Sequence, residues 1–196
     1  MARNTLVLLS GGLDSVVLTE QLHRAGRLAG AVHFIYPHPA QSHERRVVIE
    51  MRRRFYTETG RDYFREVDLP IRAKELQIGT GRPGPRIVPV RNLAMLAVAA
   101  NLADSFGATR IAIGATDTDA SGYADCSRSY LATVSRLVEP FGLQVDAPFL
   151  DRSRADVWEM ARDLGISPRD VWSCYEPAAG KPCGACNSCR QGIDGE

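Results

Sequence analysis

The chain has 196 residues, of which 44% are hydrophobic and 24% charged, and its formal net charge is +1. These values fit one soluble domain, 1–196, and give no reason to expect direct binding of nucleic acid. No apolar run reaches the roughly 18 residues of a membrane span, and Met1 leads into an apolar strand without the layout of a signal peptide, so we expect a cytoplasmic protein.

Apolar runs of strand length alternate with segments of helical periodicity along the chain. Strands are predicted at 5–9, 30–36, 64–69, 110–114 and 143–147, and helices from Leu13 to about 25, from about 40 to 59, and over 92–106, 127–140 and 153–164. The glycine- and proline-rich segment 79–89 is predicted to be a loop. The alternation predicts an α/β fold, a doubly wound and mostly parallel sheet with helices on both faces. Ligands of such sheets bind beyond the carboxyl ends of the strands, so we expect the loops after residues 9, 36 and 114 to share one functional edge.

The first strand leads directly into a glycine turn, Ser10–Ser15, with the sequence SGGLDS. Two glycines allow backbone N–H groups to approach phosphate oxygens, and the following helix directs the positive end of its dipole to the same point. Ser10 and Ser15 offer hydroxyl donors, and Asp14 can hold Mg²⁺ or orient the turn. The Walker pattern is absent, since no Gly-Lys-Ser/Thr follows. The turn predicts a phosphate-binding loop, and the alternative is an ordinary glycine turn in which a serine caps the helix.

Four of the five cysteines lie close to the end of the chain, with the spacing C-x8-C-x2-C-x2-C. In a reducing compartment such clustering favours a metal over disulfides. Four thiolates complete a tetrahedral site and leave no position for water, which predicts a structural Zn²⁺. An iron–sulfur cluster also accepts four cysteines, and four free buried thiols are the remaining alternative. The predicted ligands are Cys174, Cys183, Cys186 and Cys189, whereas Cys126 stands alone and is interpreted as a small buried residue or a contact near the substrate.

Two further polar segments have the composition of sites. Arg91 and Asn92 come at the start of a buried helix, and 115–126 (ATDTDASGYADC) is a polar loop beyond a strand end. Its carboxylates suit the amine and ring N–H of a purine-like base, or Mg²⁺, and a solvated turn fits equally well. The arginine-rich segment 45–54 is interpreted as a solvated helix face, with a nucleic-acid patch or a route for an acidic nucleotide as alternatives.

Together, and in this order, the motifs resemble the 7-cyano-7-deazaguanine synthase (QueC) family of PP-loop ATP pyrophosphatases. The family pattern is approximately SGGxDS, PxRN, a glycine-to-aspartate loop ending in SGYPDC, and the same four-cysteine spacing. The corresponding segments here are SGGLDS, PVRN, GATDTDASGYADC and the cysteines above, so the resemblance covers essentially the whole chain. It implies a PP-loop, adenine nucleotide alpha hydrolase-like core over 1–170 and a zinc-binding tail over 171–196.

The resemblance also implies a ligase that uses ATP, Mg²⁺ and ammonia to convert 7-carboxy-7-deazaguanine to 7-cyano-7-deazaguanine, and it implies a homodimer. The residues implied for binding ATP are Ser10, Gly11, Gly12, Leu13, Asp14 and Ser15. Those implied for binding the deazapurine substrate are Asn92, Asp117, Asp119, Tyr123 and Asp125. Those expected to act in catalysis are Asp14, Ser15, Arg91 and Arg154.

The chain departs from the family pattern in three places. The segment 36–43 is longer than the usual YGQRH and matches it only partly, the segment before Pro89 is shorter, and Arg154 stands where the family tends to carry lysine. Arginine keeps the charge but is not equivalent to lysine at a tight site. The alternatives are an enzyme that stops at the amide or joins the activated deazapurine to another amine, a PP-loop enzyme that modifies tRNA directly, and a nucleotide-binding module without catalysis.

Overall fold

The computed structural model describes residues 3–71, 74–78, 82–88 and 90–190. Its main sheet has five parallel strands in the order β3-β2-β1-β6-β7. These strands are β1 (Thr5–Leu8), β2 (Leu28–Ile35), β3 (Phe64–Asp68), β6 (Arg110–Ile113) and β7 (Gln144–Asp146). The chain order reverses at β1, which pairs with β2 on one side and with β6 on the other. Such a reversal is the point at which doubly wound sheets bind ligands.

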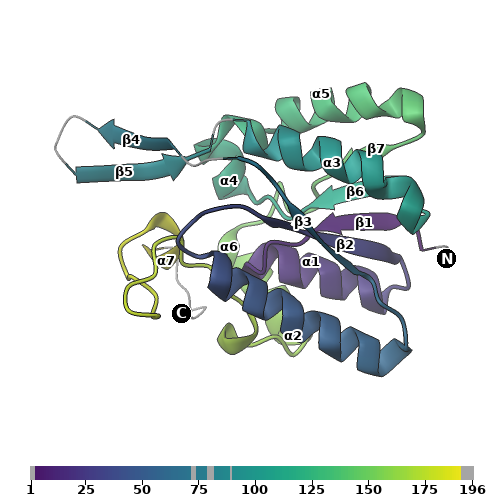
Figure 1. The fold of residues 1–196 in the computed structure, drawn as a ribbon, viewed down its shortest axis with the longest axis horizontal. Coiled ribbons are helices and arrows are strands. Elements are labelled where there is room, and N and C mark those ends of the chain that lie inside the picture. The colour runs from purple at the N-terminus through teal and green to yellow at the C-terminus, as the bar shows by residue number, and fades with distance from the viewer. Residues whose placement is uncertain (1–2, 72–73, 79–81, 89, 191–196) are drawn as a thin grey trace.

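Helices cover both faces of the sheet (Figure 1). One face carries α1 (Leu13–Arg24), α2 (Gln41–Thr59) and α6 (Arg154–Asp163). The other face carries α3 (Arg91–Phe106) and α5 (Arg128–Val138). The structure therefore confirms the predicted class, the parallel sheet and the order of its strands and helices.

The central strand β1 lies between two hydrophobic cores, which explains its uninterrupted apolar run. Val7 and Leu9 belong to the core beneath α1, α2 and α6, whereas Leu6 and Leu8 belong to the core beneath α3 and α5. Successive strand side chains point to opposite faces, so a strand covered on both faces needs a hydrophobic residue at every position. The turn that follows β1 is thus held by the most buried part of the sheet.

The prediction of a loop over 79–89 is wrong for part of that range. β4 (Lys74–Ile78) and β5 (Arg82–Ile87) pair antiparallel in a second, two-stranded sheet. Residues 79–81 and 89 lie outside the described part of the chain. In a two-stranded sheet both strands are edges, and an edge tolerates prolines, which lack the N–H of a ladder hydrogen bond. The proline-rich composition therefore did not prevent a strand.

Short helical segments also occur in the polar loop 115–126 and in the cysteine tail. The polar loop 115–126 contains α4 (Asp117–Gly122) and the 3-10 turn Ala124–Cys126, and the cysteine tail contains α7 (Asn187–Arg190). A capping box between Thr116 and Asp119 starts α4. The sequence did not predict this helix because aspartate, threonine and glycine also favour turns. The other short elements are the 3-10 turns Glu139–Phe141 and Pro168–Asp170.

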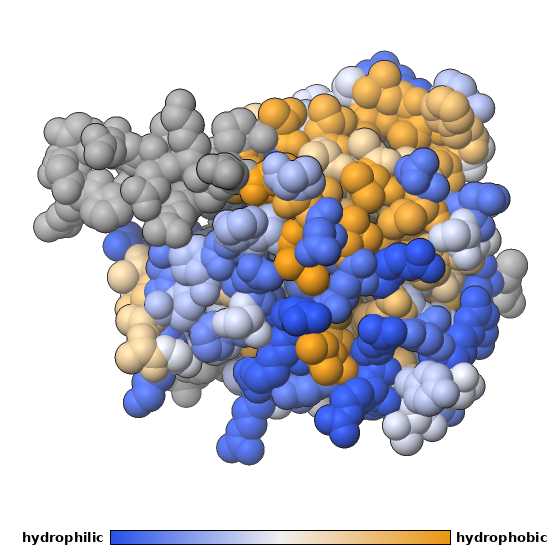
Figure 2. Space-filling model, in the orientation of Figure 1, coloured by the Kyte–Doolittle hydropathy of each residue, from blue (hydrophilic) through white to orange (hydrophobic). Residues whose placement is uncertain are grey.

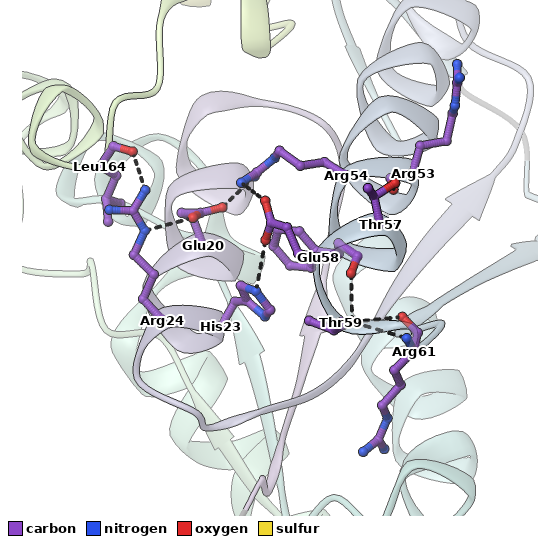
Figure 3. Close-up of polar contacts among 11 residues, drawn as sticks. Glu20, His23, Arg24, Arg53, Arg54, Thr57, Glu58, Thr59, Arg61 and Leu164 are labelled. Carbon is purple, nitrogen blue, oxygen red and sulfur yellow. Dashed lines mark hydrogen bonds and ion pairs between the residues drawn. The ribbon is translucent and has the colours of Figure 1, made fainter.

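The arginines of α2 form ion pairs along the surface of that helix. Arg54 donates to Glu20 Oε2 at 2.5 Å and Arg24 donates to Glu20 Oε1 at 2.8 Å, which joins α2 to α1 (Figure 3). Burial acts to raise the pKa of Glu20, but the hydrogen bonds from Arg54 and Arg24 outweigh it and hold the pKa below its usual value. Further pairs on α2 are Arg45–Glu66, Arg46–Glu50 and Arg52–Asp62. These pairs lie on an exposed helix face, as the interpretation of a solvated face expected.

The surface differs between the two helical layers. Figure 2 shows hydrophilic residues over α2 and a concentration of hydrophobic residues over α3 and α5. Exposed large hydrophobic side chains include Leu93 in α3, Leu137 in α5 and Phe141 directly after α5. Among the described residues, no helix is both long enough and apolar enough to cross a membrane.

Candidate functional site

Gly11 places the predicted phosphate loop, Ser10–Ser15, against the first turn of α2. Its φ of +94° lies in the left-handed region. A Cβ at this position would lie 2.6 Å from the carbonyl oxygen of Glu44 and 3.1 Å from its Cα. Both observations require glycine, since only glycine has no Cβ and adopts such a φ without strain. The loop is therefore wedged between β1 and α2.

Three successive backbone N–H groups of the loop converge on hydroxyl oxygens. The N–H groups of Ser10 and Gly11 both donate to Ser15 Oγ at 3.2 Å, and the N–H of Gly12 donates to Ser10 Oγ at 3.2 Å. Ser15 Oγ itself donates to the carbonyl of Gly12 at 3.0 Å. Converging N–H groups at the start of a helix form the nest in which proteins bind phosphate. The loop is a compact glycine turn between β1 and α1, as predicted, and its binding of phosphate stays a prediction.

The end of β6 lies against the same loop. A Cβ at Gly114 would lie 2.8 Å from the carbonyl carbon of Asp14 and 3.0 Å from the nitrogen of Ser15. Because β1 and β6 are parallel neighbours, the loops that follow them meet at one edge. β2 is parallel to β1 as well, so the shared edge predicted for all three loops is confirmed.

Asp14 and Arg154 form a buried ion pair that joins the phosphate loop to α6. Arg154 donates from Nη1 to Asp14 Oδ2 at 2.5 Å and from Nη2 to Ser188 Oγ at 3.1 Å. Burial raises the pKa of Asp14, and the charge of Arg154 opposes that rise without cancelling it. Asp14 Oδ1 and Arg154 Nε are buried and have no hydrogen-bond partner within the described residues. Because an unpaired buried polar atom is costly, these two atoms fit a polar ligand or a cation.

The segment that precedes the cysteines lies directly on the phosphate loop. The backbone N–H of Trp172 donates to the carbonyl of Gly11 at 2.9 Å. The indole of Trp172 stacks on His43 of α2, with the ring centroids 3.9 Å apart, and donates to the carbonyl of Cys174 at 2.9 Å. The cysteine tail is therefore anchored to the loop immediately before its first cysteine.

The four predicted cysteine ligands meet at one place, where their Sγ atoms all lie within 4.8 Å of one another. Sγ of Cys189 lies 3.4 Å from that of Cys186 and 3.9 Å from that of Cys183. Four thiolates around one zinc ion, each about 2.3 Å from the metal, would stand about 3.8 Å apart in tetrahedral geometry. In a 4Fe–4S cluster each thiolate binds a different iron and the sulfurs stand farther apart. The spacing fits a single ion.

Backbone N–H groups also stabilise a thiolate in this cluster, which is the form that binds a cation. The N–H groups of Ala185 and Cys186 donate to Cys183 Sγ at 3.4 and 3.3 Å. These hydrogen bonds lower the pKa of Cys183 to about 6, whereas burial raises the pKa of Cys189 to about 12. A bound metal removes this contrast because it deprotonates every coordinating thiol.

Asn92 ties the start of α3 to the turn at Asp125 and Cys126. Its backbone N–H donates to Asp125 Oδ2 at 3.3 Å, and its buried side-chain amide donates to the carbonyl of Asp125 and to Cys126 Sγ, each at 3.2 Å. Burial, with Asp119 and Asp125 nearby, raises the pKa of Cys126 to about 12 and keeps it a neutral thiol. Asn92 and Asp125 thus join the start of α3 to this turn, and their predicted contact with a substrate stays a prediction.

Arg91 and three residues that sequence reasoning missed form a buried cluster at the carboxyl end of β2. Arg91 donates from Nη1 to Tyr36 Oη at 3.2 Å, and the Tyr36 ring stacks on His38 with centroids 4.4 Å apart. His38 Nε2 lies 3.4 Å from Glu44 Oε2. Val90, directly before Arg91, has a φ of 56°, a left-handed conformation that strains a β-branched residue. Strain of this kind is concentrated at functional sites.

His38 and Glu44, two of the titratable side chains of this cluster, are both biased toward their neutral forms. Burial lowers the pKa of His38 to about 4, with help from Arg91 and His33, and burial raises the pKa of Glu44 to about 7 against the charge of Arg91. His38 Nε2 is buried, and its approach to Glu44 does not have hydrogen-bond geometry. Perturbed titratable groups mark candidate functional sites. The one signal in the sequence was the departure of segment 36–43 from the family pattern.

The residues predicted from the polar loop are not all gathered in the site. Asp117 is exposed, and its Oδ1 accepts the N–H of Thr118 at 2.6 Å. Asp119 caps α4 by accepting the N–H of Thr116 at 3.0 Å, and Tyr123 is half-buried.

Tyr175, directly after the first cysteine ligand, is a further residue that sequence reasoning missed. It lies within electrostatic reach of Asp119, Tyr123, Arg154 and Arg91. The cysteine tail therefore brings a tyrosine within electrostatic reach of both arginines. No motif singled out this tyrosine, because its position depends on how the tail packs.

The chain resembles known proteins in both sequence and fold. The model of the family described as Queuosine biosynthesis protein QueC matches residues 4–195. A 7-cyano-7-deazaguanine synthase of Sulfurovum sp. is 28% identical, covering 100% of this chain and 94% of the relative, and one of Rhizorhabdus wittichii is 33% identical, covering 96% and 88%. The solved U34-tRNA thiolase NcsA of Methanococcus maripaludis, described with its 4Fe–4S cluster, has a TM-score of 0.52 at 14% identity over 98% of this chain and 65% of that one, which is a likeness of fold alone. With a family match over nearly its full length, the chain belongs to the QueC family of enzymes.

Proposed function

We propose that this enzyme is an ATP-dependent ligase that converts 7-carboxy-7-deazaguanine and ammonia to 7-cyano-7-deazaguanine, releasing AMP and pyrophosphate. The observation that carries the proposal is the phosphate loop at the switch point of the sheet, with the Asp14–Arg154 pair beside it, in a member of the QueC family. The relatives described above are 7-cyano-7-deazaguanine synthases and align over nearly their whole length.

The first round activates the carboxylate, which resists ammonia because its charge repels a nucleophile and oxide is a poor leaving group. A carboxylate oxygen attacks the α-phosphorus of ATP, pyrophosphate leaves, and an acyl adenylate forms. The lone pair of ammonia then forms the C–N bond while the C–O bond breaks. AMP leaves with the electron pair of that bond, and the nitrogen loses a proton to give the amide.

The second round turns the amide into the nitrile. The amide oxygen attacks the α-phosphorus of a second ATP, pyrophosphate leaves, and the nitrogen loses a proton. The C–O bond of the adenylated intermediate then breaks, AMP leaves, and the nitrogen loses its remaining proton as the C≡N bond forms. Each nitrile therefore consumes two ATP and produces two AMP.

The protein contributes position and charge to both rounds. The N–H groups and hydroxyls of Ser10–Ser15 hold the pyrophosphate part of ATP, and Arg91 and Arg154 stabilise the negative charge that develops beside it. Asp14, whose Oδ1 has no hydrogen-bond partner within the described residues, holds Mg²⁺, which neutralises phosphate charge when bound. The proposed lining of the substrate pocket is Asn92, Asp117, Asp119, Tyr123 and Asp125.

We further propose that the cysteine cluster holds Zn²⁺ as a structural ion, because its sulfur spacing fits one tetrahedral metal. An iron–sulfur cluster is the alternative, and metal analysis of protein purified under anaerobic conditions separates the two. In this proposal residues 1–170 are the ATP-binding core, and 171–196 are the tail that the metal organises.

The test is mass spectrometry of a reaction that contains the purified protein, ATP, Mg²⁺, ammonium and 7-carboxy-7-deazaguanine. The expected products are the nitrile and two AMP for each nitrile. Amide without nitrile would favour the alternative of an enzyme that stops at the amide or transfers the activated deazapurine to another amine. That alternative is retained because the chain departs from the family pattern at Arg154 and in the segment 36–43. No AMP with this substrate would contradict the assignment.

We also propose a homodimer in the cytoplasm that acts on the deazapurine and ammonia and binds no nucleic acid directly. The hydrophobic surface over α3 and α5 is the candidate interface (Figure 2). Light scattering during gel filtration tests the dimer. Leu137→Glu and Phe141→Glu, at exposed hydrophobic positions, are the variants expected to weaken it.

A further inference from the structure

Both rounds of the proposed reaction release protons from nitrogen, and the carboxylates predicted from motifs are already engaged. Asp14 is paired with Arg154 at 2.5 Å, Asp119 caps α4, and Asp125 accepts the N–H of Asn92. A carboxylate oxygen that already accepts a hydrogen bond from a fixed partner is less available to a proton on the substrate. A carboxylate without such a hydrogen bond is the better proton acceptor.

Glu44 lies directly beside the phosphate loop. Its Cα is 3.1 Å, and its carbonyl oxygen 2.6 Å, from the point where a Cβ on Gly11 would stand. Its side chain is 16% exposed and approaches His38 Nε2 at 3.4 Å. No motif or family resemblance singled out this residue, which belongs to the first turn of α2.

The groups around Glu44 come from the end of β2 and the start of α3. Beyond the end of β2 are Tyr36 and His38, with His33 behind them, and from the start of α3 comes Arg91. Arg91 lowers the pKa of Glu44, but burial outweighs it and raises the pKa to about 7. His38 stays neutral at this pH because burial lowers its own pKa to about 4. General bases work best when their pKa lies near the working pH.

We infer that Glu44 is the general base that takes the proton from nitrogen when ammonia attacks the acyl adenylate. As the C–N bond forms and the C–O bond to AMP breaks, AMP keeps the electron pair of the broken bond and one N–H proton passes to a Glu44 carboxylate oxygen. His38, whose Nε2 lies 3.4 Å from Glu44 Oε2, packs beside this carboxylate. The inference rests on the proposed function and assigns a residue to a step that the motifs leave without one.

The test separates adenylation from amide formation in the full-length, metal-loaded protein. Carboxylate-dependent exchange between ATP and labelled pyrophosphate reports adenylation, and mass spectrometry reports the amide. Glu44→Gln is expected to retain exchange within about threefold of wild type and to lose amide formation by about 100-fold or more. Glu50→Gln is the control, because this glutamate lies on the same helix with a side chain 55% exposed. It is expected to match wild type in both assays.

The pH dependence supplies a second readout. Ammonium loses its proton as pH rises in every variant, so the informative quantity is the ratio of wild-type to Glu44→Gln amide formation. That ratio is expected to increase with a midpoint near the pKa of Glu44, about 7, because only the ionised carboxylate accepts a proton. Glu44→Asp, which keeps a carboxylate, is expected to restore part of the rate.

Equal losses of exchange and amide formation in Glu44→Gln, or no loss in either, would overturn the inference. A ratio that does not change with pH would overturn it as well. Absence of exchange in the wild-type protein would instead overturn the proposed function, and the inference with it. Retained exchange shows in the same experiment that Glu44→Gln is folded and binds ATP.

Discussion

The guanidinium of Arg154 lies 2.5 Å from the carboxylate of Asp14, and the two side chains are only 14% and 15% exposed. Its second terminal nitrogen donates to Ser188, which lies between two of the cysteine ligands. A planar guanidinium can make both contacts at once, whereas the single ammonium of a lysine is a compact point charge. In this chain one side chain therefore connects the phosphate loop to the cysteine cluster.

Removing Arg154 is expected to be far more costly than removing an exposed arginine. Arg154→Ala leaves Asp14 buried without its cation and should lower the free energy of unfolding by about 3–5 kcal/mol. Arg154→Lys should lower it by about 1–2 kcal/mol, since the charge remains and the contact with Ser188 is lost. Urea denaturation measures both. Arg128→Ala is the control, because Arg128 and Asp151 form a pair of the same length, 2.5 Å, in which the side chains are 67% and 83% exposed. Arg128→Ala should lower the free energy of unfolding by no more than about 1 kcal/mol. If Arg154→Ala lowers it by the same small amount, the prediction is contradicted.

The contact between Arg154 and Ser188 can be isolated by a double-mutant cycle. Ser188→Ala leaves a buried donor of Arg154 unsatisfied and should destabilise the protein by about 1–3 kcal/mol. In an Arg154→Lys background the same substitution should have little effect, because the contact is already lost. Ser105→Ala, at an exposed serine that donates only to the carbonyl of Leu102 among the described contacts, is the matched control. Additive effects of the two substitutions would show that the hydrogen bond contributes nothing.

The cysteine cluster makes a prediction about metal content. Cys183→Ser removes one of four ligands, so the bound metal should fall well below one per chain, and thermal stability should fall with it. Metal analysis by mass spectrometry and a thermal melt measure the two effects. Cys126→Ala is the control, since Cys126 is the cysteine outside the cluster and contacts Asn92. Loss of metal in both variants, or in neither, would contradict the assignment of ligands.

The sequence predicted the edge of the sheet at which the site forms, because parallel strands carry their following loops to the same edge. Ser10–Ser15 could be predicted in detail, since a glycine turn between a buried strand and a helix has few conformations. The hairpin of β4 and β5 could not be predicted, because prolines are compatible with a strand only when both strands are edges.

The candidate site was predictable only where its residues are contiguous. Tyr36, His38 and Glu44 come together with Arg91 through packing between the end of β2 and the starts of α2 and α3, and no local pattern encodes that contact. The family resemblance implied Asp117 and Asp119 as substrate residues, which stays a prediction, and the structure shows that Asp119 also caps a short helix. Aspartate serves both purposes, so composition alone does not separate them.

The phosphate loop tolerates no side chain at Gly11. Gly11→Ala would place a Cβ 2.6 Å from the carbonyl of Glu44 at a φ of +94°, so either α2 or the loop must move. We expect ATP binding, measured by calorimetry, to fall at least about tenfold, because the converging N–H groups lose their alignment. Gly26→Ala is the matched control, since its φ is also positive, +67°, and nothing lies within 4 Å of its Cβ position. That variant should lose about 1–2 kcal/mol of stability and keep its affinity for ATP. Equal affinities for ATP in the two variants would contradict the close approach between Gly11 and Glu44.

Glu44 predicts a stability that falls as pH rises. Its pKa is about 7 in the folded protein and near 4.5 when unfolded, so the folded state holds the proton more tightly. The free energy of unfolding should therefore decrease between about pH 4.5 and 7, by up to about 3 kcal/mol from this group. Glu44→Gln cannot ionise and should escape the decrease, so it should match wild type near pH 4.5 and exceed it at pH 8. Urea denaturation across this range, with Glu50→Gln as the exposed control, measures the difference. A stability difference between Glu44→Gln and wild type that is constant with pH would mean that Glu44 titrates normally. A stability difference that increases with pH would show that the fold maintains a buried carboxylate beside the phosphate loop at the expense of stability.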